Sequence, residues 1–418
     1  MGGRAWWQLK MALLTLSILV LTTQSSGDAG LWPADDGNDQ HRRVAASAPA
    51  ARWSAPLPIW WAASSATTTS SSAPVCDGTT DVSSFLDLSI VLPPGICRVT
   101  RSIVLTSGYF LRGTGTTIFF DNPTDDLFVA HTVLQDVTIS DLIINSTAGQ
   151  RKAGHVINGS FLRSRFTSLT VLNQFNGFLI PAYEFVWFSS VLVRYPSSGA
   201  RYGFYLGQLS SDPSSNPGSE IYLSHVQVYG GEILDRGYVV ESTDAVYFTN
   251  SGGGGCVSHL LHIFRSPGGH APNNIFMTNM VSDYTVTGSS TLIQGAINLQ
   301  ISNSWFCSSH VGLELQDVGR LLVSNSQVFN NRATGLLSNN SFGRVSGCFF
   351  SAQNVAIRVY TARTNDLSLS LSDNTDGGST NRSVITDDRS NRMIVTGNMW
   401  VSGTTFGTPP QVNANNGF

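Results

Sequence analysis

The chain has 418 residues, a formal net charge of −3 at neutral pH, 12% charged residues and 40 glycines. The charge is nearly balanced, and the sequence has no Lys/Arg cluster and no basic stretch interleaved with aromatic residues. It therefore lacks the usual features of a protein that binds nucleic acid. Abundant glycine and few charges suit a stack of tight turns better than a helical protein.

Residues 1–27 have the layout of a secretory signal peptide. Arg4 and Lys10 precede the apolar run 11–21, and small polar residues follow as far as Gly27. This run is too short for a comfortable membrane span, and no later segment is apolar enough to cross a bilayer. We therefore expect a secreted, extracellular protein with no membrane span after cleavage; a retained signal anchor is the alternative.

Residues 28–75 are dominated by Ala, Ser, Pro and Thr and show no apolar periodicity, so we expect a disordered linker. Secretion would also make four Asn-x-Ser/Thr sites available for glycosylation. These sites are Asn145, Asn158, Asn339 and Asn381.

The five cysteines lack the spacing of metal ligands, and we expect neither a metal nor another cofactor. Cys76 and Cys97 flank the first expected strands, and we predict a disulfide between them at the N-terminal end of the domain. The run Gly252–Gly255 is not a phosphate loop, because no Lys-Ser/Thr follows it. We interpret it as a flexible loop beside Asp244.

Three motifs open the region after the linker: Asp77-Gly78-Thr79-Thr80-Asp81, Val91-Leu92-Pro93-Pro94-Gly95 and Leu111-Arg112-Gly113-Thr114-Gly115. They resemble the N-terminal entrance of the pectate-lyase-like superfamily of right-handed parallel β-helices, which includes polygalacturonase-like, glucanase-like and tailspike-like proteins. The resemblance implies the fold and says little about the chemistry. Members of the superfamily usually have a capping helix after the first motif, and only residues 82–89 are available for one here. Some tailspike-like relatives form trimers, so the oligomeric state stays open.

A short phrase recurs eleven times from Ile139 to Gly397, at intervals of 22 to 35 residues: an apolar residue, then Ser or Thr, then a turn-forming residue. The copies begin at Ile139, Phe166, Phe188, Leu223, Phe248, Met277, Ile301, Val323, Val345, Leu371 and Val395. A period of about 20 to 50 residues indicates a solenoid, propeller or array. The third position holds residues that accept a left-handed backbone, which predicts one shared corner in every coil.

The unit is too short for two helices or a propeller blade, and its runs of Val, Ile, Phe and Thr favour strands. We predict an all-β, single-stranded, right-handed parallel β-helix of about eleven to twelve coils over residues 76–401, with a polar tail over 402–418. A β-sandwich is the alternative, but it would not explain one fixed phrase per coil.

A second phrase, a small residue followed by alternating apolar residues, lies between the copies of the first. Alternation predicts that Phe204, Leu206, Ile297, Leu299, Leu313, Leu315, Ile357 and Val359 point inward. The residues between them then form an outward column of Tyr205, Glu241, His262, Asn298, Glu314 and Arg358. Such a column offers an extended polysaccharide hydrogen-bond partners, a stacking ring and acids or bases. Outward strand positions of any solenoid are polar, which is the structural alternative.

Glu241 and Glu314 lie three coils apart, about 14 Å at strand spacing, which is too far for a pair of glycosidase carboxyls. Glu241 with Asp244, and His262 one coil later, form the preferred catalytic set. Glu314 with Asp317 is the second choice, and Tyr205, Asn298 and Arg358 are expected to bind substrate. Charged turn residues without a catalytic role are the alternative.

Several short elements look like those of polygalacturonase-like hydrolases, including Gly269-His270-Ala271 and Asn374-Thr375-Asp376. Their order along the chain is scrambled, so no catalytic residue is transferred from that family.

These features predict a secreted protein that acts on or binds an extracellular polysaccharide, with glycoside hydrolysis as the preferred activity. A polysaccharide lyase and a non-catalytic adhesion or carbohydrate-binding module are the alternatives.

Overall fold

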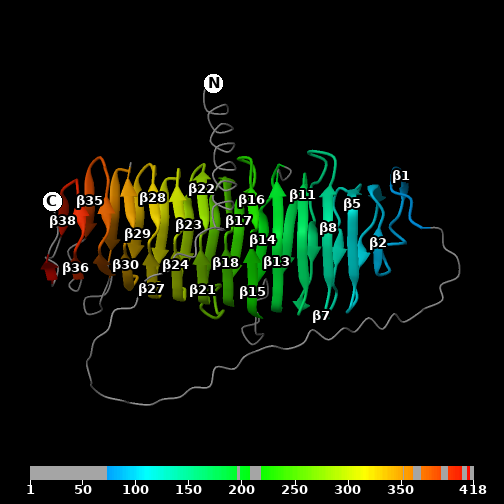
Figure 1. The fold of residues 1–418 in the computed structure, drawn as a ribbon, viewed down its shortest axis with the longest axis horizontal. Coiled ribbons are helices and arrows are strands. Elements are labelled where there is room, and N and C mark those ends of the chain that lie inside the picture. Colours follow the sequence, from blue (N-terminus) through cyan, green and yellow to red (C-terminus); the bar gives the residue numbers. More distant parts are fainter. Residues whose placement is uncertain are drawn as a thin grey trace, which may run out of the picture. The chain divides into compact units, whose positions relative to one another are not determined.

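The computed structural model describes residues 73–194, 198–207, 218–351, 353–360, 369–386, 394–406 and 412–414. The expected signal peptide and almost all of the expected linker lie outside these ranges. The chain divides into the units Met1–Thr69 and Ser70–Phe418, and all the described residues belong to the second. Within the described ranges every regular element is a β-strand, and neighbouring coils pair in parallel (Figure 1). The predicted all-β parallel solenoid is confirmed.

One sheet contains thirteen described strands, one from each coil, which is close to the expected number of coils. In chain order they are β4 (Ile103–Val104), β6 (Phe128–Val129), β9 (His155–Asn158), β12 (Asn176–Ile180), β14 (Tyr202–Gly207), β17 (Arg236–Glu241), β20 (His259–Phe264), β23 (Ser289–Gln294), β26 (Val311–Gln316), β29 (Thr334–Asn339), β32 (Val355–Tyr360), β35 (Arg382–Thr386) and β38 (Thr404–Phe406).

The second sheet contains twenty-six described strands and bends within each coil. Its first strands are β1 (Asp77–Asp81), β2 (Ile90–Leu92), β3 (Gly95–Val99), β5 (Phe110–Phe120), β7 (Leu134–Gln135), β8 (Thr138–Asn145), β10 (Phe161–Leu162), β11 (Arg165–Leu172) and β13 (Tyr183–Arg194). Strands that precede the later bends are β15 (Gly218–Ser224), β18 (Asp244–Thr249), β21 (Asn273–Thr278), β24 (Ile297–Ser302), β27 (Gly319–Ser324), β30 (Gly343–Ser346), β33 (Leu369–Ser372), β36 (Ile394–Thr396) and β39 (Val412–Ala414). Strands that follow these bends are β16 (Gln227–Tyr229), β19 (Gly252–Cys256), β22 (Val281–Thr285), β25 (Trp305–Cys307), β28 (Gln327–Phe329), β31 (Phe349–Ser351), β34 (Thr375–Asp376) and β37 (Met399–Trp400).

The recurring phrase forms the bend of the second sheet. Its third residue has a positive φ of 48° to 65° in all eleven copies, and we call this column the asparagine corner. Its members are Asp141, Ser168, Ser190, His225, Asn250, Asn279, Asn303, Asn325, Gly347, Asp373 and Gly397. The Ser or Thr before each corner residue pairs in register with that of the next coil, for example Ser302 with Ser324 and Ser324 with Ser346. The predicted shared corner is confirmed, and it uses residue types that accept this backbone conformation.

The core lies between the two sheets. Phe204, Leu206, Leu313, Leu315 and Ile357 are fully buried, as the alternation predicted. Phe178 stacks on Phe204 with ring centroids 4.5 Å apart, so inward rings continue from coil to coil. Burial of this much apolar surface is the dominant contribution to the stability of the solenoid.

At the N-terminal end, the predicted pairing of Cys76 with Cys97 is present as a disulfide. Turns, and no helix, follow β1, where the resemblance would place a capping helix, and Val82 and Leu86 are fully buried there. Tyr109 donates a hydrogen bond of 2.8 Å to the carbonyl oxygen of Leu86. At the other end, β38 and β39 continue the two sheets beyond residue 401, into the segment expected to be a polar tail.

The interpretation of Gly252–Gly255 as a flexible loop is wrong, because these residues lie in the buried strand β19. A Cβ on Gly253 would overlap the carbonyl oxygen of Val228, and one on Gly252 would overlap that of Val281. The glycines allow neighbouring backbones to approach closely, which is a use of glycine inside strands. No helix of the described ranges is long and apolar enough to cross a membrane.

Candidate functional site

Outward side chains of the thirteen-stranded sheet form a polar surface across its central strands. Strand register places Tyr205, His262, Glu314 and Arg358 in one column, with Val239, Leu292 and Leu337 between them. Glu241, Gln294 and Gln316 lie two residues further along their own strands, β17, β23 and β26. We call the six residues Tyr205, Glu241, His262, Gln294, Glu314 and Gln316 the polar face.

Tyr205 and Glu241 are directly linked across the polar face. The Tyr205 hydroxyl donates a hydrogen bond to Oε2 of Glu241, which is only 8% exposed. Burial, followed by the bond to Glu241 and its negative charge, raises the pKa of Tyr205. Tyr205 therefore keeps its proton at neutral pH and holds the carboxylate in place.

His262 begins a directed chain of hydrogen bonds. Its Nε2 lies 2.9 Å from Oε1 of Gln294, whose Nε2 donates to Oε1 of Gln316 over 2.7 Å. Nε2 of Gln316 in turn donates to Oε1 of Glu314 over 2.7 Å. Since Gln294 presents its acceptor to the imidazole, the proton of His262 is assigned to Nε2.

The other ring nitrogen of His262 is left unused. Nδ1 is buried and has no hydrogen-bond partner among the described residues. Burial lowers the pKa of His262 to about 4, against the opposing effect of the bond to Gln294. The imidazole is therefore neutral at pH 7, and its unpaired lone pair lies on a nitrogen that is shielded from solvent.

A second polar cluster on the same sheet was not predicted. His155 on β9 lies 2.8 Å from Asp126 through Nδ1 and 2.8 Å from the Tyr202 hydroxyl through Nε2. Asn158 also donates to Asp126, over 2.7 Å, and the rings of Tyr202 and Tyr205 meet edge to face at 5.0 Å. Asp126, the pair His155 and Asn158 on β9, and Tyr202 on β14 come from three coils, so no single local sequence pattern reveals the cluster.

The structure corrects the predicted column at Asn298. Asn298 lies on β24 of the other sheet, and Ile297 is 42% exposed instead of pointing inward. The strand of that coil in the thirteen-stranded sheet is β23, where Ser290 and Thr291 occupy buried positions. Because Ser290 and Thr291 are polar, β23 lacks the alternating apolar pattern of its neighbours. Residues 296–299 have that pattern, so the sequence assigns them to this sheet instead.

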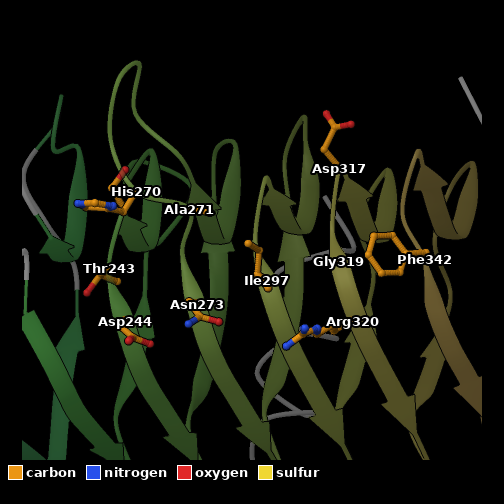
Figure 2. A pocket seen from close by; sticks show the side chains of 11 residues that line it. Thr243, Asp244, His270, Ala271, Asn273, Ile297, Asp317, Gly319, Arg320 and Phe342 are labelled. Atoms are coloured by element: carbon orange, nitrogen blue, oxygen red, sulfur yellow. The ribbon is translucent and has the colours of Figure 1, made fainter. Parts of the chain in front are cut away.

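Asp244 and Asp317 lie apart from the polar face, in a hollow of about 900 Å³ over the first residues of β18, β21, β24 and β27 (Figure 2). Asn273, Ile297, Gly319, Arg320 and Phe342 also line it, and the segment that carries His270 forms its rim. Asp244 accepts hydrogen bonds of 2.8 Å from the Ala245 amide and from Asn274. Asp317 accepts one from Asn340.

The two members of the preferred acid–base pair, Glu241 and Asp244, therefore lie in different surroundings. Glu241 is engaged by Tyr205 on the polar face, whereas Asp244 lines the hollow. Three strand steps separate Glu241 from Glu314, as the repeat predicted, and three steps separate Asp244 from Gly319 beside Asp317. At about 4.8 Å per step, each separation is near 14 Å, beyond the carboxyl spacing of either class of glycosidase.

The remaining predicted substrate residue, Arg358, lies at the C-terminal end of the column. Its Nη1 donates to the Tyr360 hydroxyl over 3.2 Å, and its Nε is buried without a described partner. Among the predicted glycosylation sites, Asn339 and Asn381 are exposed, while Asn145 and Asn158 are half-buried. The described part of the chain holds no group of three or more His, Cys, Asp or Glu side chains arranged to bind a metal ion.

Comparison with known proteins gives structural matches alone. No protein-family model matches the chain, and no curated protein sequence matches it. The A-module of the Azotobacter vinelandii mannuronan C-5 epimerase AlgE6 is similar in structure, with a TM-score of 0.52 and 15% identity over 81% of this chain and 98% of that one. The A-module of AlgE4 from the same organism has a TM-score of 0.47 at 12% identity, covering 82% and 97% of the two chains. The surface adhesin PfbA of Streptococcus pneumoniae has a TM-score of 0.41 at 9% identity, covering 82% and 91%.

At these identities the similarity concerns the fold. The stacked parallel coils and the shared asparagine corner agree with the motifs at the N-terminal entrance. The chain has a parallel β-helix fold, and its N-terminal motifs resemble those of the pectate-lyase-like superfamily.

Proposed function

We propose that this protein binds an extracellular polysaccharide along the polar face of the thirteen-stranded sheet. The observation that carries the proposal is the run of hydrogen-bonding groups across five successive strands, from Tyr205 on β14 to Glu314 on β26. Tyr205, Gln294, Glu314 and Gln316 are only half-buried, so their polar atoms are close to the surface. A row of fixed donors and acceptors at strand spacing suits a long ligand with a repeating set of hydroxyl groups.

An extracellular location is part of the proposal. The N-terminal sequence has the layout of a signal peptide, and the Cys76–Cys97 disulfide is of a kind that persists in oxidising compartments. The Azotobacter structure that shares the fold acts on mannuronan, as its name states, which agrees with a polysaccharide ligand without carrying the proposal.

Two catalytic versions differ in the group that takes a proton. Hydrolysis would use Glu241 and Asp244 as acid and base, with His262 nearby. A lyase reaction would use His262, whose contact with Gln294 through Nε2 fixes the ring, and it would require the buried Nδ1 to become accessible when a sugar binds. Nδ1 would take the proton from a sugar carbon, the C–H electrons would form a C=C bond, and the glycosidic oxygen of the next sugar would leave with its bonding pair and take a proton from water. The carboxyl version would require Glu241, which is engaged by Tyr205, to act with Asp244, which lines a separate hollow.

Binding and catalysis are tested together on a panel of soluble plant, algal and bacterial polysaccharides. We expect binding of at least one member by affinity electrophoresis, and about tenfold weaker binding for Tyr205→Phe, which leaves Glu241 without its buried donor. Tyr229→Phe is the matched control, because Tyr229 donates to Gln227 over 2.9 Å on the other sheet. Equal loss in both variants, or no binding by the wild type, would contradict the proposal.

Release of reducing ends without new ultraviolet absorbance would indicate hydrolysis; release together with the absorbance of a new C=C bond would indicate a lyase. Glu241→Gln and His262→Gln then separate the two bases. Binding without release would identify the non-catalytic module.

A further inference from the structure

A second left-handed corner runs along the start of the strands that precede the asparagine corner. Eight residues in register there have a positive φ of 48° to 63°, and we call them the strand-start corner. They are Asp136, Arg163, Phe185, Glu220, Ala245, Asn274, Asn298 and Arg320.

The two corners differ in the residues that occupy them. The asparagine corner uses Asp, Ser, His, Asn or Gly in every coil. The strand-start corner includes Arg163, Phe185, Glu220 and Arg320, although a positive φ is uncommon for long or bulky side chains. Asn274 and Asn298 show that asparagine fits the same backbone in adjacent coils. A long or bulky residue at a positive φ, at a position where asparagine fits, indicates that its side chain has another use.

Three of these side chains, Arg163, Phe185 and Arg320, lie at two hollows in the surface. Asp136, Arg163 and Phe185 line one of about 410 Å³, together with Trp187 and Arg165. Arg320 lines the larger hollow of Figure 2, where its guanidinium extends along the same row as Asn273 and Asp244. Arg320 is exposed and forms no ion pair within the described ranges.

Each hollow also exposes an aromatic ring beside its arginine. Phe185 is 37% exposed, and its ring stacks on Trp187 with centroids 6.5 Å apart. Phe342 is 47% exposed and lines the same hollow as Arg320, with its ring against Gly319. An exposed apolar ring beside a planar hydrogen-bonding group is a pairing found in ligand sites, and it suits the apolar face and the hydroxyl rim of a sugar.

We propose that the strand-start corner is a second carbohydrate-binding strip, separate from the polar face, that takes an extended chain of neutral sugars. Six strand steps separate Arg163 from Arg320, about 29 Å, which accommodates several sugar units. The carboxylates of Asp136, Glu220, Asp244 and Asp317 lie along the same strip and would repel a uniformly anionic chain. Arg163 is already paired with Asp136 over 3.1 Å.

The proposal of this strip rests on the proposed function, since both assume a polysaccharide ligand. The test below is designed so that failure of the strip can be told from failure of the proposed function. The probes are soluble xyloglucan, galactomannan and mixed-linkage glucan, with alginate and polygalacturonate as anionic counterparts, titrated into the full chain. Arg320→Asn is the main variant, and Phe185→Ala tests the other hollow. Ser190→Asn is the matched control, because Ser190 is exposed at φ 55° on the asparagine corner.

We expect Arg320→Asn and Ser190→Asn both to raise the melting temperature, because asparagine accepts the left-handed backbone. Arg320→Asn and Phe185→Ala should weaken binding of the neutral probe by about fivefold to tenfold, whereas Ser190→Asn should leave it unchanged; Tyr205→Phe should weaken it independently through the polar face. Unchanged affinity in both strip variants overturns the strip even where Tyr205→Phe confirms the polar face. A lower melting temperature for Arg320→Asn, or binding of the anionic probes alone, also overturns it. Failure of every probe to bind the wild type overturns the proposed function itself.

Discussion

Nε2 of His262 lies 2.9 Å from Oε1 of Gln294, and this contact assigns the proton of a buried imidazole whose Nδ1 has no described partner. The folded protein disfavours the charged form of His262 because burial lowers its pKa from 6.5 to about 4. The unfolded chain binds a proton at a higher pH than the folded chain does. The free energy of unfolding should therefore fall as the pH drops from about 6.5 to about 4.

The first prediction concerns this pH dependence. His262 alone should account for a loss of up to about 3 kcal/mol across that window, and none above it. His259, whose pKa burial also lowers, should leave a smaller residual slope when His262 is replaced by Gln. Urea unfolding of both proteins between pH 4 and 7 measures the difference. A His262→Gln variant with the same slope as the wild type would show that His262 titrates normally.

The second prediction concerns the asparagine corner. Asn325, at φ 48°, should tolerate Gly and resist Ala, because a Cβ without a polar group disfavours the left-handed backbone. We expect Asn325→Ala to lower the free energy of unfolding by about 1 kcal/mol and Asn325→Gly to lower it by less. Denaturant titration compares the two variants. If Ala proves no worse than Gly, the corner is not under the backbone constraint described.

The third prediction concerns the close approach of β16 and β19. Gly253→Ala places a methyl group against the Val228 carbonyl oxygen, where backbone has no room to yield. We expect a loss above about 3 kcal/mol or failure to fold. Gly149→Ala is the control, since its φ is also positive at 74° but nothing lies within 4 Å of the added Cβ. Comparable losses in both variants would assign the effect to φ instead of to the collision.

The fourth prediction concerns a row of aromatic rings on the second sheet. Tyr222 and Tyr247 stack at 4.8 Å with an interplanar angle of 10°, and Phe276 continues the stack at 5.0 Å from Tyr247. Their faces cover one another, so Tyr247→Leu should cost about 1 kcal/mol of stability and leave glycan affinity unchanged. Thermal unfolding and glycan titration of the same variant test this. Weaker glycan binding by a stable Tyr247→Leu protein would make these rings part of a ligand site.

The fifth prediction concerns glycosylation. Asn339 and Asn381 are exposed, whereas the amide of Asn158 donates to Asp126 over 2.7 Å. Expression through a eukaryotic secretory pathway should modify Asn339 and Asn381 and spare Asn158. Mass spectrometry of glycopeptides measures the occupancy of each site. A fully occupied Asn158 would show that the Asp126 cluster forms differently from the arrangement described.

The sequence predicted the fold well because the β-helix repeats its constraints. Every coil needs a left-handed corner, and the residues that satisfy it, such as Asn303 and Asn325, recur at a readable interval. Alternation likewise identified Phe204 and Leu313 as core residues. Such patterns are local, and eleven copies make them visible.

The site was less predictable because it depends on register between coils. Tyr205 and Glu241 are 36 residues apart, and their contact follows from strand pairing that no single segment encodes. Asn298 was placed in the wrong sheet because β23 carries Ser290 and Thr291 where its neighbours carry apolar residues. Arg320 and Phe185 cannot be identified from the sequence, because a positive φ is a property of the backbone. Residue type predicts a positive φ only at Asn, Gly and similar residues.

Hydrogen–deuterium exchange of the full chain, with and without a saturating polysaccharide from the panel, tests the central claim most directly. The proposal predicts slower exchange in β14, β17, β20 and β23, whose outward side chains form most of the polar face. A bound polysaccharide that leaves exchange in these four strands unchanged would contradict it.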